Sequence, residues 1–410
     1  MSARTAPPRP LVALFTAGHL APYLLPTLVG RLDSRLGVSA PQAGAIGSVL
    51  LLSSASAGFV LASRVDRIGA RTLARTGLAL AALGYGGAAL TASVPAVVLG
   101  ALLGGLGSGT ATAVAATGMA ARRAPQRATT LGLLSVSALA GAVHLTVPHL
   151  GPGHGLPFGA MALTALAVWP FTGRLQGRTR VSASRAPREP LPQLRWGLLL
   201  AVALPFWSMA QNCLWGVSGR IGVVQARLDE AAVGVVFALA LGAGLLGAVA
   251  ARALGPRLGL ALPVGAGSAV IAVCIALSAA ATGLPAFAVG EIGWNAVHPL
   301  VLSYVIGLAA SLDVRGRWAV LAGSALSLGA AAGPLVGSVL SARAGFPAMG
   351  VVLGAGLLVT AVPMTAVALR PGRPRGPEAA EVPGTPEIPV DGPGVPAPRR
   401  PYGRADSAND

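Results

Sequence analysis

Apolar stretches separated by short polar segments run along almost the whole chain. Each stretch is about 20 residues long, the length that a helix needs to cross the hydrocarbon core of a bilayer. The strands of a membrane barrel would instead alternate in polarity over about 10 residues. The pattern therefore predicts an all-α integral membrane protein with 12 transmembrane helices, at residues 10–30, 41–62, 72–92, 95–119, 129–148, 156–173, 197–219, 231–251, 259–281, 285–308, 317–340 and 346–369.

The composition agrees with this interpretation. Hydrophobic residues make up 54% of the chain and charged residues 10%, and the mean hydropathy is +0.70. A soluble protein carries about 25% charged residues, so this chain has too few to cover a surface that faces water. The apolar stretches are rich in Ala and Gly, which allows helices to pack closely in lipid.

One longer polar segment divides the spans into two sets of six. It follows the sixth span, is basic and contains proline, so it reads as a linker. The segment after the last span is rich in Pro and Gly with scattered charge, a composition that does not build a core. The sequence thus predicts an N-terminal six-helix bundle at 1–173, a cytoplasmic linker at 174–196, a C-terminal six-helix bundle at 197–370 and a disordered cytoplasmic tail at 371–410.

The basic residues are distributed unevenly between the two sides of the predicted membrane. All 30 are arginine, and with the N-terminus inside, 25 of them fall in the termini and in alternate loops. This positive-inside pattern predicts a multi-pass protein of the plasma (inner) membrane with both termini in the cytoplasm. Topology and anionic lipid explain the net charge of +17, and we expect no nucleic-acid partner. The five remaining arginines are Arg31, Arg35, Arg220, Arg227 and Arg343.

The two sets of six spans resemble each other in the positions of short arginine motifs. Arg67-Ile68-Gly69 follows the second span, and Arg257-Leu258-Gly259 follows the eighth, 190 residues later. Arg127 and Arg317 open the fifth and eleventh spans at the same offset. These offsets fit a duplicated six-helix unit, an arrangement that is common in secondary transporters.

The loop between the second and third spans carries an unusual cluster of charges. It reads ASRVDRIGAR at residues 62–71. The arginines fit a topological role, but topology requires no acid at Asp66. In this loop the sequence resembles the major facilitator superfamily, whose signature runs Gly-x-x-x-Asp-Arg-x-Gly-Arg-Arg/Lys. Asp66, Arg67, Gly69 and Arg71 match that signature, whereas Ala replaces its first Gly and one of its last basic residues.

The resemblance covers residues 1–370 and implies both a fold and a mechanism. The implied fold is two pseudo-symmetric six-helix bundles, and the implied mechanism is alternating access to a central cavity. In the family the loop cluster latches the two halves together when the transporter faces outward. We expect this gating role for Asp66, Arg67 and Arg71, with Gly69 permitting a tight turn.

The tenth span contains the one carboxylate that lies well within a predicted helix. Glu291, Asn295 and His298 follow one another at i, i+4 and i+7, so they share a helix face beside Trp294. An ionisable face is costly in lipid, so we expect it to line a cavity. Glu291 is the candidate for proton coupling, and the other three are candidates for substrate binding. The alternative is a hydrogen-bonded structural glutamate, or one that is hydrated near the outer mouth.

Other polar and aromatic residues within the spans are further candidates for substrate binding. In the seventh span, aromatic and amide side chains stand together, as suits an amphipathic ligand. Trp215 fits an interfacial aromatic belt equally well. Each isolated histidine fits either a ligand contact or a hydrogen bond between packed helices. These candidates are His19, Tyr23, His144, Gln211, Asn212 and Trp215.

Signals for an enzyme, a metal site or a cofactor are weak. The segment GGLGSGTATA lacks the lysine of a phosphate-binding loop, and its glycines fall within a span, where they favour helix packing. Cys213 and Cys274 lie in different spans without metal-ligand spacing. We therefore expect no catalytic residue, no metal and no cofactor. Some members of the resembled family carry an arginine in the fourth helix, where Ala101 stands here.

These observations favour a monomeric secondary transporter that moves a small organic solute. Efflux driven by exchange with protons is the first hypothesis. Uptake by symport, or facilitated diffusion without coupling, is the alternative, and a transporter-like receptor that binds without moving its ligand is a hypothesis from another class. The sequence does not identify the substrate. Multiply charged anions are disfavoured because no buried Arg or Lys lies clearly inside a span, and Arg220, at the outer end of the seventh span, is the one position that could overturn this expectation.

Overall fold

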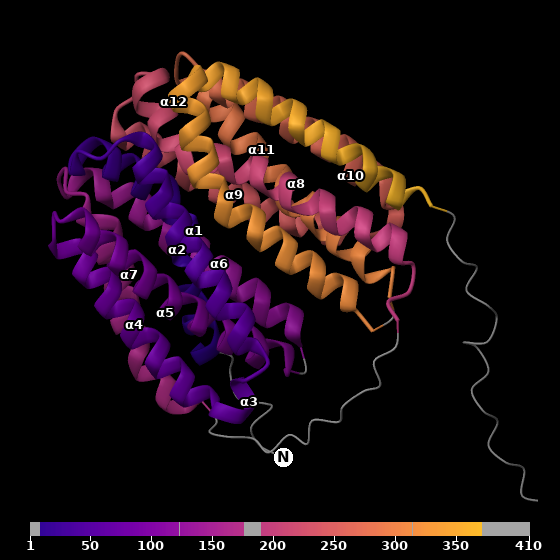
Figure 1. Ribbon diagram of the computed structural model, residues 1–410, viewed down its shortest axis with the longest axis horizontal. Coiled ribbons are helices and arrows are strands. Elements are labelled where there is room, and N and C mark those ends of the chain that lie inside the picture. Colours follow the sequence, from indigo (N-terminus) through magenta and orange to yellow (C-terminus); the bar gives the residue numbers. More distant parts are fainter. Residues whose placement is uncertain (1–8, 123, 176–189, 314, 371–410) are drawn as a thin grey trace, which may run out of the picture. The chain divides into compact units, whose positions relative to one another are not determined.

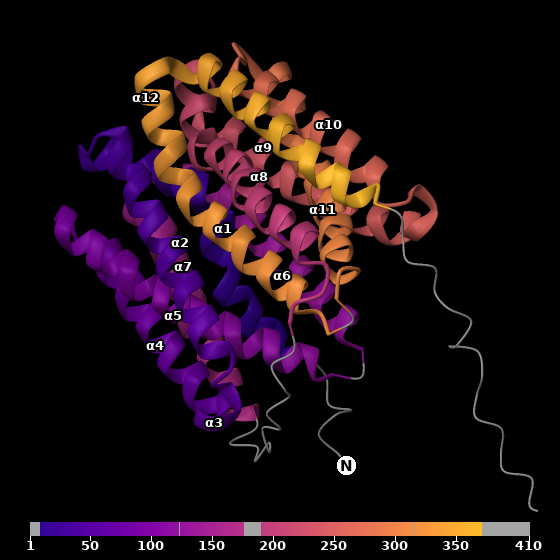
Figure 2. The same cartoon turned by 45° about the vertical axis from the view of Figure 1, so that its right-hand side comes forward.

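The computed structural model describes residues 9–122, 124–175, 190–313 and 315–370. The predicted tail at 371–410 and residues 176–189 of the predicted linker lie outside these ranges. Within them, every regular element is helical (Figures 1 and 2). The long helices are α1 (Arg9–Leu36), α2 (Ala40–Ala62), α4 (Ala70–Leu90), α5 (Val94–Ala120), α6 (Pro125–Thr146), α7 (Gly155–Val168), α8 (Leu194–Arg220), α9 (Glu230–Leu254), α10 (Ala261–Ala279), α11 (Leu284–Ala310) and α12 (Arg317–Ala368).

Short helical turns occupy several of the connections. α3 (Val65–Ile68) lies between α2 and α4, and η1 (Val147–His149) follows α6. η2 (Trp169–Arg174) extends α7, and η4 (Gly255–Leu258) follows α9. η3 (Ile221–Gln225) continues α8 as a π-helical turn.

The 12 predicted spans are confirmed, although two of them form one continuous element. In the described residues, 11 helices are long and apolar enough to cross a membrane. One of these, α12, has 52 residues and is interrupted at Gly345, where φ is 79° and ψ is 165°. That positive φ is accessible to glycine at little cost, and it separates the predicted spans 317–340 and 346–369.

Two groups of helices are visible in Figure 1, one in purple and one in red to yellow. In the first half, α5 packs against α1, α2 and α4, and α1 also packs against α6. In the second half, α12 packs against α8 and α10, and α11 packs against α9 and α10. The halves meet where α2 contacts α12, where α6 contacts α9 and where α1 contacts α8. This is the predicted arrangement of two six-helix bundles.

The two ends of the helices differ in their arginine content. We call the end that holds the loops after α2, α5, α7, α9 and α11 the arginine-rich end. The opposite end, with the loops after α1, α4, α6, α8 and α10, is the arginine-poor end. Between the ends, large apolar side chains such as Leu83 and Leu246 are 75% and 72% exposed, which suits helices surrounded by lipid.

The loop between α11 and α12, at the arginine-rich end, is ordered by one acid. Arg317 Nε donates a hydrogen bond to Asp313 Oδ2 at 2.6 Å, and the backbone N–H of Arg315 donates to Oδ1 at 3.2 Å. The bond from Arg317 is the main cause that holds the pKa of Asp313 below its ordinary value.

Candidate functional site

A cavity of about 350 Å³ lies between the two halves. We call it the central cavity. Its walls come from α1 and α6 of the first half and from α8, α9 and α11 of the second. Lining residues such as Leu133 of α6 and Ala248 of α9 extend it from the middle of the helices toward the arginine-rich end. Among the described residues, the polar and aromatic ones that line it are Tyr23, Ser137, Asn212, Trp215, Trp294, Asn295, His298 and Ser303, and no lining residue is charged.

Three aromatic rings form one wall of the central cavity. The rings of Trp294 and His298 are stacked, with centroids 5.9 Å apart and an interplanar angle of 29°. Trp215 meets Trp294 edge to face at 5.8 Å. Trp215 Nε1 also donates to the carbonyl oxygen of Pro22 in α1 at 2.9 Å. That carbonyl is free because Pro26, four residues later, has no N–H.

Two asparagines of the second half present their side chains to the same cavity. Asn212 Nδ2 donates to the carbonyl oxygen of Ser208, and Asn295 Nδ2 donates to that of Glu291, both at 2.9 Å. Each amide therefore uses its nitrogen to hold its own helix. The amide oxygens are left for a molecule in the cavity.

Glu291 does not line the central cavity, contrary to the expectation from its helix face. Its side chain is completely buried between α8, α10 and α11. Oε1 accepts from Ser218 Oγ at 2.7 Å and from Ser278 Oγ at 2.6 Å, and Oε2 accepts from Trp294 Nε1 at 2.9 Å. The carboxyl group is thus separated from the cavity by Trp294, whose indole touches both.

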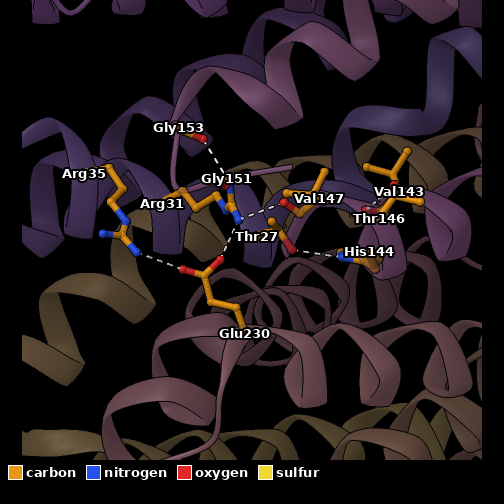
Figure 3. Close-up of polar contacts among 10 residues, drawn as sticks. All are labelled: Thr27, Arg31, Arg35, Val143, His144, Thr146, Val147, Gly151, Gly153 and Glu230. Atoms are coloured by element: carbon orange, nitrogen blue, oxygen red, sulfur yellow. Dashed lines mark hydrogen bonds and ion pairs between the residues drawn. The ribbon is translucent and has the colours of Figure 1, made fainter. Parts of the chain in front are cut away.

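The halves are joined at the arginine-poor end by Glu230, at the first residue of α9 (Figure 3). Its carboxylate lies 2.5 Å from Arg31 Nη2 and 3.3 Å from Arg35 Nη2, both from α1. Arg31 is 3% exposed and also donates to the carbonyl oxygens of Val147, Gly151 and Gly153. One acid of the second half is therefore held by two arginines of the first.

A second ion pair joins the halves at this end with the charges reversed. Arg220, the last residue of α8, has its Nε 2.7 Å from Asp33 Oδ2 of α1. Close backbone packing accompanies the pair, because a Cβ on Gly219 would overlap the carbonyl oxygen of Pro26. The arginine-poor end is closed by charge and by contact.

His144 contributes to the same closed end rather than to the central cavity. Its Nε2 lies 3.1 Å from the carbonyl oxygen of Tyr23, which can only accept, so Nε2 carries the proton. Nδ1 then accepts from Thr27 Oγ1 at 2.9 Å (Figure 3). On its other side the ring meets Phe237 of α9 edge to face at 5.2 Å. The hydrogen bonds tie α6 to α1.

Two further candidates from the sequence lie away from the central cavity. His19 stacks on Phe15, with ring centroids 3.9 Å apart, and its Nδ1 contacts the Phe15 carbonyl oxygen at 3.2 Å. Gln211 is buried, and its Nε2 donates to the carbonyl oxygen of Trp207 at 2.9 Å. Of the nine predicted substrate-binding residues, Tyr23, Asn212, Trp215, Trp294, Asn295 and His298 line the central cavity.

The predicted gating loop lies at the arginine-rich end, and no hydrogen bond or ion pair found among the described residues joins it to the second half. Gly69 has a φ of 104°, which suits glycine, and it separates α3 from α4. Arg71 donates to the carbonyl oxygens of Gly173 and Leu175, within the first half. Asp66 and Arg67 are exposed.

Several residues of these sites were not singled out from the sequence. Ser218 and Ser278 give no signal, because a serine in a span rich in small residues fits ordinary helix packing. The sequence alone indicates only a topological role for Arg31 and Arg35. Asp33 and Glu230 could have drawn attention, because acids are scarce in this chain and both lie beside the few arginines of the arginine-poor side.

Comparisons by sequence and by structure differ in outcome. No family model matches the chain, and no curated protein matches it by sequence. Solved structures match its fold over most of its length. The human organic anion transporter MFSD10 (TETRAN) superposes with a TM-score of 0.65 at 19% identity, over 88% of this chain and 100% of that one.

Two further structures match to a similar extent. The nucleoside transporter NupG gives a TM-score of 0.68 at 12% identity, over 88% of this chain and 99% of that one. A bacterial homologue of the human lysosomal transporter Spinster, in an inward-facing and unoccupied conformation, gives 0.64 at 14% identity, over 90% and 96%.

Proposed function

This chain has the fold of the major facilitator superfamily, and from that premise we propose that it is a secondary transporter of a small organic solute. The solute binds in the central cavity, and the two halves rock about it so that the cavity opens to each side in turn. The three solved structures with this fold described above are all named as transporters.

The observation that carries the proposal is the combination of a cavity between the halves with a closed arginine-poor end. The walls of the cavity come from both halves, so a relative motion of the halves changes access to it. Among the described residues, the ion pairs that join the halves, such as Arg31–Glu230 and Arg220–Asp33, lie at the arginine-poor end. Such a structure corresponds to the state in which the solute exchanges through the arginine-rich end.

The excess of arginine assigns that end to the cytoplasm by the positive-inside rule. The protein then lies in the plasma membrane with both termini inside, and the structure corresponds to its inward-facing state. In the opposite state, Asp66, Arg67 and Arg71 latch the cytoplasmic ends of the halves. The exposure of Asp66 and Arg67 fits a latch that is open here.

Glu291 is the group that we assign to proton coupling. A buried carboxylate without a cation costs several kcal/mol, and no ion pair of Glu291 is found among the described residues. Ser218 Oγ also lies 2.9 Å from the carbonyl oxygen of Leu214, to which it can donate its single proton. Glu291 can then donate to Ser218, so the network accommodates a proton on Oε1.

Trp294 connects this proton to the solute. Its ring lines the central cavity while its Nε1–H binds Glu291 Oε2. A solute that shifts the indole would weaken that bond and change the proton affinity of the carboxyl group. We propose that this contact couples efflux of the solute to the inward movement of protons.

Solute flux into proteoliposomes, measured with and without an imposed pH gradient, tests both parts of the proposal. Glu291→Gln is the informative variant, because its amide oxygen can accept from Trp294 Nε1 and its amide nitrogen can donate to Ser218, as the protonated acid does. We expect gradient-dependent flux in the natural protein and the loss of that dependence in Glu291→Gln.

The possible outcomes separate the alternatives. Flux that ignores both the gradient and the substitution would mean an uncoupled facilitator with a structural Glu291. Flux driven in the same direction as the protons would mean symport. Solute binding without flux in any condition would mean a receptor and would refute transport.

A further inference from the structure

We propose that the solute of the central cavity is an aromatic amine or amide that carries at least two N–H or O–H donors and no negative charge. This inference rests on the proposed function, because it names the class of solute that the same cavity transports.

The hydrogen-bond donors of the two tryptophans in the aromatic wall are already used. Trp215 Nε1–H binds the Pro22 carbonyl oxygen, and Trp294 Nε1–H binds Glu291. An indole offers no other polar hydrogen. The two tryptophans therefore contribute flat apolar surface and the negative faces of their rings, but no donor for an anionic ligand.

The acceptors of the second half are left over. The nitrogens of Asn212 and Asn295 face backbone carbonyl oxygens of their own helices, and a carbonyl can only accept, so the assignment of nitrogen and oxygen in both amides is fixed by chemistry. Both amide oxygens remain, each with two lone pairs. Ser303 adds a further acceptor, because its hydroxyl proton goes to the Pro299 carbonyl oxygen at 2.8 Å.

Proline in α11 adds one more acceptor beside these groups. Pro299 has no N–H, so the backbone carbonyl of Asn295, four residues earlier, has no helical partner. It lies beside Gly244 of α9, where a Cβ would be 3.3 Å away, and Gly244, Asn295 and Pro299 all line the cavity. α11 thus offers backbone and side-chain acceptors at one position.

The donors that remain are few. They are one of the two hydroxyl protons of Tyr23 and Ser137, which hydrogen-bond to each other on the wall of the first half, one N–H of the His298 ring and the second N–H of Asn295. Among the described residues the cavity has no arginine or lysine to pair with a carboxylate. A ligand with its own N–H or O–H groups can hydrogen-bond to the acceptors of this cavity. An anion would leave both those acceptors and its own charged group without hydrogen-bond donors.

The aromatic wall and the volume of the cavity indicate the shape and size of the ligand. The stacked Trp294 and His298 rings, with Trp215 edge-on, form a surface that suits a planar ring. A cavity of about 350 Å³ accommodates one or two fused rings with short substituents.

Matched sets of three probes test the class without changing the protein. One set is 3-aminobenzamide, its fully N-methylated derivative and 3-aminobenzoate. The other is indole-3-carboxamide, its fully N-methylated derivative and indole-3-carboxylate. Within a set the ring is constant, while the first probe carries donors, the second carries none and the third is an anion.

Dissociation constants for the full chain in detergent give the result. We expect at least one carboxamide to bind about tenfold more tightly than both other members of its set, as the loss of one hydrogen bond predicts. Equal or tighter binding of a carboxylate or of an N-methylated probe would overturn the class. So would the absence of binding by both carboxamides at millimolar concentration.

Asn295→Leu and Asn212→Leu test whether these two amide oxygens are the acceptors that bind the carboxamide. Each should weaken the bound carboxamide about tenfold and leave the affinity for its N-methylated partner unchanged, so every variant carries its own control. Loss of affinity for both probes alike would mean a disturbed cavity and would contradict the assignment of these oxygens as acceptors.

Flux of the same probes into proteoliposomes separates this inference from the proposed function. Flux of a carboxylate but not of a carboxamide would refute the class of solute and leave transport standing. Tight binding of a carboxamide without flux would refute transport and leave the chemistry of the cavity standing.

Discussion

At the scale of the residue, Trp294 makes two distinct contacts with one side chain, and we propose a separate function for each. The side chain contributes to the wall of the central cavity, and its indole N–H donates to a buried carboxyl group. Phenylalanine keeps an aromatic ring and removes the N–H, so a single substitution separates the two functions.

We expect Trp294→Phe to keep solute binding within a few-fold and to reduce gradient-dependent flux about tenfold, because Glu291 loses a hydrogen bond worth about 1.5–3 kcal/mol. Flux in proteoliposomes at fixed solute concentration measures the effect. Trp215→Phe is the matched control, since it removes an indole N–H that binds Pro22 and not Glu291. A similar loss of coupling in both variants would contradict the proposed link.

The sequence predicted this site only in part, and the reason lies in the polar partners. Glu291, Trp294, Asn295 and His298 stand out because ionisable and aromatic residues are rare in the spans. Ser218 and Ser278 do not stand out, and their approach to Glu291 depends on how α8 and α10 pack. The spacing of residues in the sequence shows which face of a helix a residue lies on, but not how deeply its side chain is buried. The burial of Glu291 behind Trp294 could therefore not be predicted.

At the scale of the element, glycines allow α5 to pack closely against two neighbouring helices, α2 and α4. A Cβ on Gly105 or Gly109 would overlap backbone oxygens of α2, and one on Gly104 or Gly107 would overlap atoms of α4. These spacings place two small-residue faces side by side on one helix. The prediction that these glycines favour helix packing is confirmed.

Gly109→Ala should therefore destabilise the protein by about 1–3 kcal/mol, because the overlap is with the Ser54 backbone, which cannot rotate away. Thermal unfolding in detergent measures the loss. Gly87→Ala is the matched control, since no atom lies within 4 Å of its added methyl group. We expect this control to be neutral or slightly stabilising. A loss of the same size in both variants would refute the packing argument.

The elements themselves were largely predictable, because length and apolarity determine a span. The ends were less so. The fifth predicted span, α6, begins at Pro125 rather than at residue 129. Proline is favourable in the first turn of a helix, because the backbone N–H groups there have no partner within the helix and nothing is lost when one is missing. The short helix α3 and the π-helical turn η3 involve too few residues for any periodicity to show.

At the scale of the whole molecule, the structure is asymmetric along the helix direction. Charged and close contacts join the halves at the arginine-poor end, where Glu230 holds Arg31 and Arg35. At the arginine-rich end, Arg252 Nη2 donates to the Gln126 carbonyl oxygen at 3.3 Å, in exposed surroundings. Substitution of a charge at the closed end should therefore shift the balance between the two states.

Glu230→Gln leaves the buried Arg31 without an anionic partner. We therefore expect the equilibrium constant for opening of the arginine-poor end to increase roughly tenfold or more. Val233→Cys, a buried position beside the ion pairs, reports the opening in a Cys213→Ser, Cys274→Ser background. We expect a membrane-impermeant maleimide to label this cysteine faster after the substitution of Glu230.

Asp229→Asn supplies the control for that measurement. Asp229 is adjacent in sequence but caps α9 by accepting from the Ala232 N–H at 2.6 Å, a role that asparagine also fills. Its substitution should leave the labelling rate unchanged. Equal acceleration by both substitutions would show that any loss of negative charge in this loop, rather than the pairs with α1, controls the opening.

The closure at the arginine-poor end has a consequence for the conditions in which the protein works. The side chains of Glu230 and Arg35 are 33% and 44% exposed to solvent. On the proposed orientation these charges meet the extracellular fluid, where the Debye length falls from about 10 Å at 0.1 M salt to about 3 Å at 1 M. We therefore expect the arginine-poor end to open more slowly in dilute solution and faster at high salt, so that the proposed transport would respond to the salinity of the surroundings.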